Sequence, residues 1–456
     1  MKLIPTYRLL LWVGVIFLPA SLILAASASA TILTLATALV LTVTVTADAY
    51  RSRGRLKEVG VSLPEVVRVS QGREGHFELQ IENRRMNLGR LRLGLALPEE
   101  IDTPSVEISV VLPEDKPASS VSWSIKGMKQ GRYHLKACYL ETETFWGFWT
   151  IRSAIGVDME IRVYPNLFDE RKNLTGLFLN RGLGIHAQRQ IGKGRDFEQL
   201  REYLPGDSFE DIHWKTTAKR GEPITKIYQI ERTQQIYVII DASRLSARSA
   251  AVNFRPVSSQ AQNRTEKSPT MLQRFETAAL IMALAAERQG DLFGLLVFDD
   301  KVRSFLKAKA GKAHYNLCRD ALYTLQPRSV SPDFAELFTF IGTKIRRRAL
   351  LVFLTHLDDP VLADSFSQYL DLISRRHVVL VNMFNPVSAE PLFSSASISS
   401  VNEIYRALGG HLLWRRLREI QKFLQRHGVG FKMLNNETLC TDVVSQYLTL
   451  KRRQIL

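Results

Sequence analysis

The sequence predicts three parts in succession: a hairpin of two transmembrane helices, an all-β sandwich, and an α/β domain on a mainly parallel sheet. Three observations lead to this prediction. Residues 9–47 contain no charged side chain, residues 61–165 alternate apolar and polar positions, and the chain after residue 235 alternates apolar runs with amphipathic stretches. The roughly 400 residues that follow the uncharged run are too many for one ordinary domain.

The uncharged run is too long for a single membrane crossing. As a helix it would measure roughly 58 Å, about twice the hydrocarbon core of a bilayer. Two spans, residues 9–24 and 32–47, account for this length, and the small residues 25–30 turn between them. We therefore predict a hairpin with its basic flank over residues 1–57.

Basic residues flank the hairpin and set its orientation. They are Lys2, Arg8, Arg51, Arg53, Arg55 and Lys57. By the positive-inside rule we expect a multi-pass protein of the inner (plasma) membrane, with both termini cytoplasmic. A cleaved signal peptide is the alternative, but cleavage after Ala28 or Ala30 would leave the second span in place. Three widely spaced cysteines, Cys138, Cys318 and Cys440, favour a reducing compartment.

The period of the apolar residues divides the remainder. Alternation of period two and frequent turn residues predict a β-sandwich over residues 58–165. A polar stretch, residues 166–194, is interpreted as a linker. Apolar runs separated by amphipathic stretches predict an α/β domain over residues 235–456, with a polar insertion at residues 244–270.

The net charge of +16 suits a protein beside an anionic leaflet. Nucleic acid is the other partner that such a charge attracts. We do not expect it, because the basic residues are spread over many segments and no aromatic–basic module accompanies them.

Residues 195–234 contain the most informative segment. Pro205-Gly206 suits a type II turn, and Asp207 with Glu210 predicts a capping box that begins a helix, which Gly221 ends. The segment closely resembles the signature of the family called domain of unknown function 58 (DUF58). The matching residues are Asp196-Phe197, Leu200 to Tyr203, Pro205 to Asp207, Ile212 to Lys215 and Ala218-Lys219. One difference is His213, where the family usually has Asp.

The resemblance implies a von Willebrand factor A-like fold for the α/β domain and a MoxR-type AAA+ ATPase as partner. The candidate interaction residues are Arg201, Glu202, Tyr203, Pro205, Gly206, Asp207, Ile212, Trp214 and Lys215. Two interpretations stay open. The charged residues form ion pairs that lock the sandwich against the α/β domain, or the segment is a recognition surface for a partner.

Von Willebrand factor A-like domains hold Mg²⁺ with an Asp-x-Ser-x-Ser motif after the first strand. Here the motif reads Asp241-Ala242-Ser243-Arg244-Leu245, so the third ligand is missing. Pro332 stands where a Thr is expected, and His356 stands where an Asp is common. We therefore expect a weak or lost metal site, with Asp241, Ser243 and Asp358 as its remnants. Ser246 or Thr355 could compensate, and otherwise Asp241 and Ser243 cap the strand end.

Together these features predict a non-enzymatic adaptor in assembly or maturation of other complexes, with no required cofactor. No Walker A loop, Gly-x-Ser-x-Gly elbow or zincin motif is present in the sequence. The alternative is a Mg²⁺-dependent adhesion-type receptor. A nucleic-acid binder or an unrecognised hydrolase is less favoured, and the sequence leaves the oligomeric state open.

Overall fold

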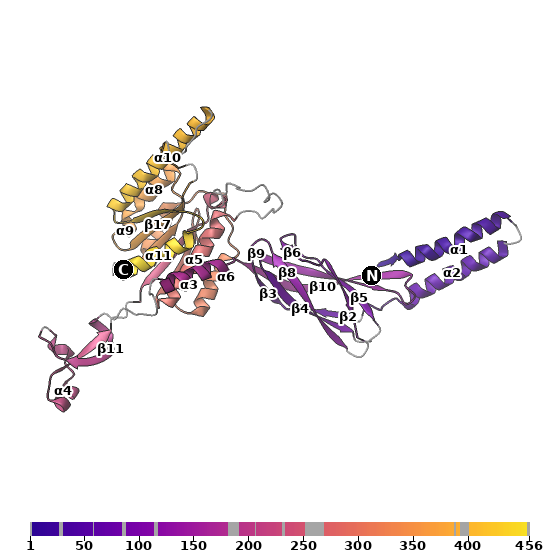
Figure 1. Cartoon of the computed structure of the whole chain (residues 1–456), viewed down its shortest axis with the longest axis horizontal. Coiled ribbons are helices and arrows are strands. Elements are labelled where there is room, and N and C mark those ends of the chain that lie inside the picture. The colour runs from indigo at the N-terminus through magenta and orange to yellow at the C-terminus, as the bar shows by residue number, and fades with distance from the viewer. Residues whose placement is uncertain are drawn as a thin grey trace. The chain divides into compact units, whose positions relative to one another are not determined.

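The computed structural model of the chain describes eleven stretches of the sequence. They are residues 2–26, 31–57, 59–83, 88–113, 117–180, 191–205, 207–229, 233–250, 269–386, 389–392 and 401–453. The chain divides into two compact units, residues 1–166 and 167–456 (Figure 1).

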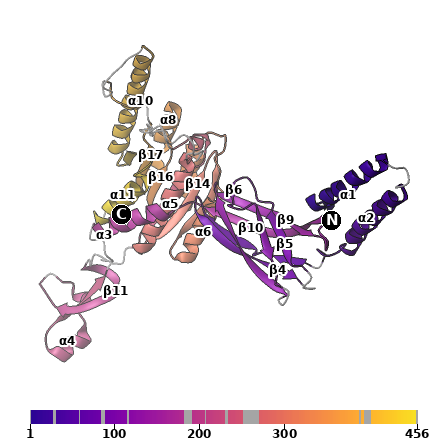
Figure 2. The same cartoon turned by 45° about the vertical axis from the view of Figure 1, so that its right-hand side comes forward.

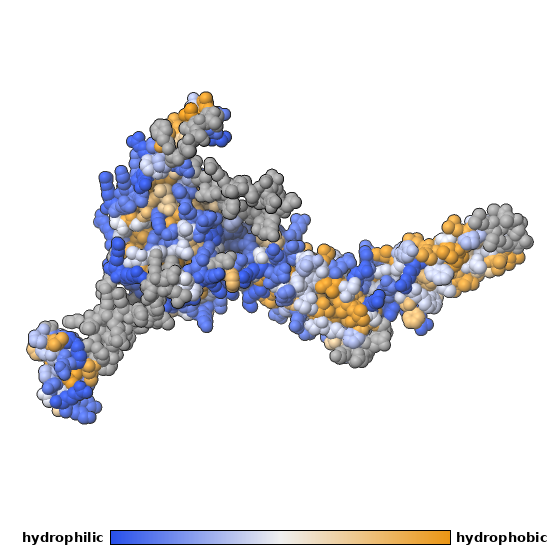
Figure 3. Space-filling model, in the orientation of Figure 1, coloured by the Kyte–Doolittle hydropathy of each residue, from blue (hydrophilic) through white to orange (hydrophobic). Residues whose placement is uncertain are grey.

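Two apolar helices, α1 (Tyr7–Ala26) and α2 (Thr31–Arg51), lie side by side in the first unit (Figures 1 and 2). Within the described residues, α2 is long and apolar enough to cross a membrane, whereas α1 is apolar over a shorter stretch, Tyr7–Ser21. Hydrophobic residues cover much of the visible face of this pair (Figure 3). Helix α2 continues one turn past the uncharged run, and residues 27–30 of the predicted turn lie outside the described residues.

Among the described residues of the same unit, ten strands form two sheets. They are β1 (Lys2–Pro5), β2 (Val59–Ser62), β3 (Val66–Ser70), β4 (Glu74–Asn83), β5 (Arg90–Leu95), β6 (Ile101–Asp102), β7 (Glu107–Val111), β8 (Ala118–Gly127), β9 (Gly131–Glu143) and β10 (Trp149–Tyr164). One sheet has the order β1-β10-β9-β5-β7, with β3 also on β10, and the other has the order β2-β4-β8-β6.

Alternate side chains of these strands point into a shared core. In β4, for example, every second residue from Phe77 to Asn83 is buried, as period-two patterning requires. Trp123, Leu79 and Leu93 are fully buried in this core. The predicted β-rich region is confirmed, but two pairings were not predicted: β1 joins the sheet from before α1, and β3 runs parallel to β10.

The second unit begins with a helix where the sequence predicted a linker. Helix α3 (Phe168–Asn180) occupies half of residues 166–194, and strand β11 begins at Ile191. Leu174 of α3 is buried in the core of this unit, and Glu170 forms a 2.9 Å ion pair with Arg274. The linker prediction was wrong because α3 is polar on average and, among its side chains that the structure describes, Leu174 is the buried one, which gives no visible period. Residues 181–190 lie outside the described residues.

The α/β sheet has the strand order β15-β14-β13-β16-β17-β18. Its strands are β13 (Gln235–Asp241), β14 (Leu292–Phe298), β15 (Val302–Lys309), β16 (Leu350–Leu354), β17 (Val378–Phe384) and β18 (Gly430–Leu434). All pairs are parallel except β14–β15. The parallel strands are the apolar runs seen in the sequence, whereas β15 was not predicted.

Helices flank this sheet, and a core lies on each of its faces. The helices are α5 (Met271–Arg288), α6 (Lys312–Leu322), α7 (Phe334–Lys344), α8 (Pro360–Tyr369), α9 (Asp371–Ser374), α10 (Val401–Arg426) and α11 (Leu439–Arg452). Part of the predicted insertion is folded, since Leu245 and Ser246 are buried in the 3₁₀ turn Arg244–Ala247. Residues 251–268 of that insertion lie outside the described residues.

We expect Leu174→Ala to lower the free energy of unfolding by about 2–5 kcal/mol, because truncation leaves a cavity in a packed core. Chemical denaturation of the solubilised chain measures this loss. The neighbouring exposed residue supplies the control, since Asn173→Ala is expected to have little effect. Equal stability of both variants would show that α3 is not part of this core.

Candidate functional site

The first candidate site lies at the carboxyl end of the α/β sheet, between β13 and β16. Strand order reverses at β13, because β14 follows it on one side and β16 lies on the other. In open α/β sheets such a switch point leaves a crevice where ligands bind. Asp241 ends β13, and Thr355 follows β16 directly. We call Asp241, Ser243, Thr355, His356 and Asp358 the strand-end cluster.

Asp241 is fully buried, and both of its carboxylate oxygens accept hydrogen bonds. The Ser243 amide donates to Oδ1 at 2.9 Å, and the Thr355 hydroxyl donates to Oδ2 at 2.8 Å. A buried carboxylate must be satisfied in this way, because an unpaired one costs several kcal/mol. The structure therefore brings together Asp241, Ser243 and Thr355, from loops more than a hundred residues apart.

Asp358 is held by a cation of the protein itself. Its Oδ2 lies 2.6 Å from an Arg248 guanidinium nitrogen. The sequence did not indicate Arg248, because it falls in the segment interpreted as an insertion. Asp358 Oδ1 and the Ser243 hydroxyl are buried and have no hydrogen-bond partner among the residues that the structure describes.

His356 is buried beside the Phe275 and Phe384 rings, at centroid distances of 5.3 and 6.3 Å, and those two rings stack on each other at 5.1 Å. Burial lowers the pKa of His356, which favours its neutral form. A neutral ring at the side of an aromatic pair is a packing element. It does not supply the carboxylate that an Asp at this position would give.

This donor set does not fit Mg²⁺ well. The ion prefers oxygen ligands in octahedral geometry, and here Leu245 and Pro332 are apolar while Arg248 already neutralises Asp358. Among the described residues, no group of three or more His, Cys, Asp or Glu side chains is placed to hold a metal ion. The unpartnered Ser243 hydroxyl and Asp358 oxygen are the features that favour a bound ion.

We expect millimolar Mg²⁺ or Mn²⁺ to leave the melting temperature of the solubilised chain unchanged. A bound metal ion present at one hundred times its Kd would stabilise the fold by about 2.7 kcal/mol, and a thermal melt detects a change of this size. A clear stabilisation that Asp241→Ala abolishes would contradict this expectation and establish a working metal site.

The second candidate site is the signature segment, which folds as a ribbon. Strands β11 (Ile191–Glu202) and β12 (Ile224–Gln229) pair antiparallel, with a 3₁₀ turn (Phe209–Asp211) and helix α4 (Trp214–Arg220) between them. We call residues 199–229 the signature ribbon. Ile212 and Ile224 are its buried apolar residues, and an isolated bridge joins Ile212 to Thr225.

Asp207 braces the turn of this ribbon. Its Oδ2 accepts a hydrogen bond from the Leu204 amide at 3.1 Å, and its Oδ1 lies 2.7 Å from an Arg201 guanidinium nitrogen. The Leu204 hydrogen bond, and then the Arg201 charge, hold the pKa of Asp207 below its usual range. This ion pair lies within the signature ribbon and not across a domain boundary. Gly206, beside it, lies outside the described residues.

The predicted helix start was wrong by several residues. Asp207 caps no helix, because its carboxylate turns back to Leu204, and α4 begins only at Trp214. His213 is the N-cap, and its Nδ1 accepts from the Thr216 amide at 3.2 Å. The position where the family usually has Asp therefore keeps a capping acceptor, a role that Asp also fills. Gly221 ends α4 with φ of +79°, as predicted.

The remaining signature residues divide by exposure. Tyr203 stacks on Phe209 at 5.9 Å, while Glu202, Pro205 and Lys215 are exposed. Large apolar side chains also face solvent: Leu204 is 56%, Phe209 72% and Trp214 66% exposed, and Leu200 is 37% exposed. Exposed apolar residues on a braced scaffold are typical of interaction sites, where aromatic anchors contribute most of the binding energy.

We expect His213→Ala to weaken helix α4 by about 1 kcal/mol, because the Thr216 amide loses the side-chain acceptor of the cap and keeps the His213 carbonyl. His213→Asp should keep the cap. Amide hydrogen exchange of residues 214–220 in the full chain measures both effects. Equal exchange in the wild type and His213→Ala would show that the cap adds no stability.

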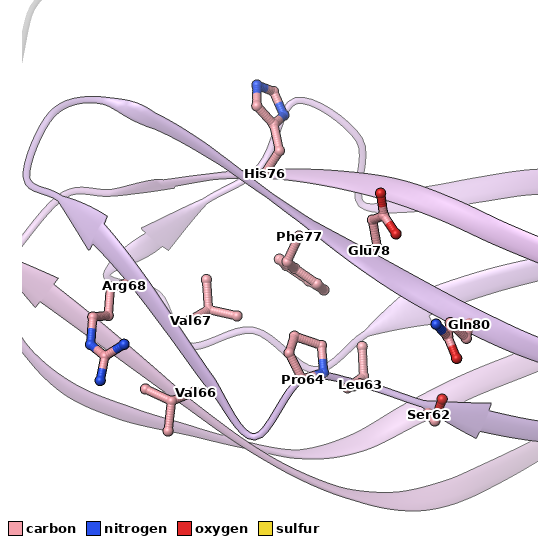
Figure 4. Close-up of a pocket in the computed structure, with 10 residues that line it drawn as sticks. All are labelled: Ser62, Leu63, Pro64, Val66, Val67, Arg68, His76, Phe77, Glu78 and Gln80. Carbon is pink, nitrogen blue, oxygen red and sulfur yellow. The ribbon is translucent and has the colours of Figure 1, made fainter.

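A pocket of about 540 Å³ lies in the first unit (Figure 4). Phe77 lines it from the core side, whereas His76 and Glu78 project from the opposite face of β4 (Figure 4). Because neighbouring residues of a strand alternate in direction, these polar groups do not converge on one ligand. The pocket therefore adds no candidate site.

A family model and a relative match parts of this chain. The model of a family described as "Protein of unknown function DUF58" matches residues 199–392. The uncharacterized protein YeaD of Bacillus subtilis (strain 168) is 23% identical over 134 residues, which is 29% of this chain, and the chain spans 33% of that relative's length. The family match covers both the signature ribbon and the strand-end cluster.

Two solved structures show a weak likeness. An aerotolerance-related membrane protein from Bacteroides fragilis NCTC 9343 has a TM-score of 0.27 and 13% identity, covering 47% of this chain and 97% of its own. The conserved hypothetical protein BatB from Bacteroides thetaiotaomicron has a TM-score of 0.29 and 11% identity, covering 48% and 99%.

Proposed function

We propose that this chain is a non-enzymatic, membrane-anchored interaction protein whose signature ribbon binds a protein partner. The observation that carries the proposal is the exposure of Leu204, Phe209 and Trp214 on a ribbon braced by the Arg201–Asp207 ion pair. We propose a MoxR-type AAA+ ATPase as the partner, because the signature resembles that of DUF58 proteins. The process would be assembly or maturation of other complexes.

The ribbon favours recognition over a purely structural lock. A lock would use the charged signature residues across a domain boundary, yet Arg201 pairs with Asp207 inside the ribbon. Burial of a Trp or Phe side chain contributes about 1.5–3 kcal/mol, so a partner that covers these exposed aromatic residues gains binding energy. These contacts support a surface that is completed by another molecule.

A non-enzymatic role is proposed because the strand-end cluster is sealed. Asp241, Ser243 and His356 are each at most 2% exposed, so a substrate cannot reach them in this conformation. The cluster's carboxylates are already engaged by Ser243, Thr355 and Arg248. The unpartnered Ser243 hydroxyl and Asp358 oxygen favour a second candidate, a Mg²⁺-dependent adhesion-type receptor, which the metal titration above would separate from the first.

We propose that α1 and α2 both cross the inner membrane and leave the sandwich and the second unit in the cytoplasm. Strand β1 precedes α1, and strand β10 follows α2, yet Lys2–Pro5 pairs with residues 149–152 in one sheet. The two strands must therefore lie on the same side of the bilayer. If α2 crosses, α1 has to return the chain, and the basic flanks favour the cytoplasmic side.

The partner proposal predicts a loss of binding from a single side chain. Trp214→Ala should weaken capture of the ATPase from gently solubilised membranes by about 2 kcal/mol, roughly thirty-fold in Kd, as expected for an aromatic anchor. Co-purification with the full chain followed by titration of the purified partner measures this loss.

Leu372→Ala is the matched control, because Leu372 is equally exposed but lies on α9. Its binding should equal that of the wild type. The proposal fails if no AAA+ ATPase is recovered, or if Trp214→Ala and Leu372→Ala bind alike.

A further inference from the structure

The loop between β9 and β10, residues 144–148, contacts both apolar helices. The Thr6 hydroxyl, just before α1, donates to the Gly147 carbonyl at 2.6 Å, and the Thr6 amide donates to the Phe148 carbonyl at 3.0 Å. On the other side, the Trp149 indole N–H donates to the Val45 carbonyl of α2 at 3.1 Å. One loop thus holds the start of α1 and the end of α2.

Asp48, in the last turns of α2, is the centre of this contact and is 1% exposed. Its Oδ2 accepts from the Thr144 hydroxyl at 2.5 Å, and its Oδ1 accepts from the Trp146 amide at 3.1 Å. Gly147 has φ of +75°, and a Cβ at this position would come within 2.9 Å of the Arg8 guanidinium. The loop is therefore fixed against the helices and does not hang free.

The fixed loop turns aromatic side chains outward. Phe145 is 69% and Trp146 48% exposed, and Tyr7 and Tyr50 at the same helix ends are more than 70% exposed. The Arg51 guanidinium lies over the Phe145 ring, 5.8 Å from its centroid. Aromatic rings mixed with Arg and Lys at the end of an apolar helix are the composition of a membrane–water interface.

We propose that the β9–β10 loop is a second membrane contact, in which Phe145 and Trp146 enter the headgroup layer beside α2 and seat the sandwich on the lipid surface. This proposal rests on the proposed anchor, because the depth of the loop is set by α2. Arg8, Arg51 and Arg53 would meet anionic headgroups there, which attract basic residues near the surface. The other end of β9 would lie about 40 Å away along the strand, at 3.3 Å per residue.

Fluorophore labels at single cysteines test this depth in the full chain, reconstituted in nanodiscs that contain anionic lipid. Cys138, Cys318 and Cys440 are buried, so the introduced thiol is the accessible one among the described residues. The labelled variants are Trp146→Cys in the loop, Leu39→Cys in α2, and Met128→Cys at the far end of β9 as control. Quenching by lipids that carry a spin label near the headgroup is compared with quenching by lipids that carry it near the acyl end.

We expect the label at 146 to be quenched mainly by the headgroup quencher, the label at 39 mainly by the acyl-end quencher, and the label at 128 by neither. Asp48→Ala should reduce the quenching at 146 and leave that at 39 unchanged, because Thr144 and Trp146 lose their acceptor. If 146 behaves like 128 while 39 is quenched, or if Asp48→Ala leaves 146 unchanged, the loop proposal is overturned and the anchor stands. If 39 is also unquenched, the anchor itself is wrong.

Discussion

The first unit depends on a buried carboxylate, that of Asp48, at the end of an apolar helix. A charge in such a place is costly unless it is paired, and here a hydroxyl and a backbone amide of the β9–β10 loop satisfy it. The bonds join residues almost a hundred positions apart, so the helix and the sandwich become one body. A flexible tether would let the sandwich diffuse around its anchor, whereas this joint fixes its orientation. The proposed headgroup contact follows from that rigidity.

The second unit places its polar groups at the carboxyl end of its sheet. Parallel strands collect polar groups at their carboxyl ends, and in this chain those groups are largely paired with one another. Asp241 is held by Ser243 and Thr355, and Asp358 by Arg248. The unused capacity for interaction lies instead on the signature ribbon, whose exposed apolar side chains have no core to enter. Fold and proposed function are thus divided between two parts of the same unit.

Much of the architecture could be predicted because long periodic segments carry a strong signal. The apolar strands from Gln235 onward coincide with β13, β14, β16, β17 and β18. Strand β15 was missed because charged residues interrupt it at an edge of the sheet. Helix α7 has a visible signal in the sequence, since Phe334, Leu337, Phe338 and Ile341 have helical spacing.

The positions of the candidate sites in the chain could be predicted, whereas most contacts within the sites could not. Asp241 could be placed because it follows an apolar strand, but its partner Thr355 and the Arg248 of Asp358 come from distant loops. The predicted start of the signature helix was wrong for a local reason. A carboxylate can accept a hydrogen bond from a turn amide instead of capping a helix, and Asp207 accepts from the Leu204 amide of the turn. His213 could not be recognised as a cap until the helix start was known.

Strand β1 has a consequence for the order of biosynthesis. Lys2–Pro5 pairs with the first residues of β10, and β3 pairs with the last residues of the same strand. The ribosome makes β10 long after α1 and α2. In the proposed topology, the apolar helices would reach the lipid while their sheet is still missing, and the first half of β10 would have an open edge until β1 pairs with it. The sandwich would then be completed only after both helices have inserted and returned the chain to the same side. A chain whose helices failed to turn back would be left with an unpaired strand, a form that quality-control proteases and aggregation both select against.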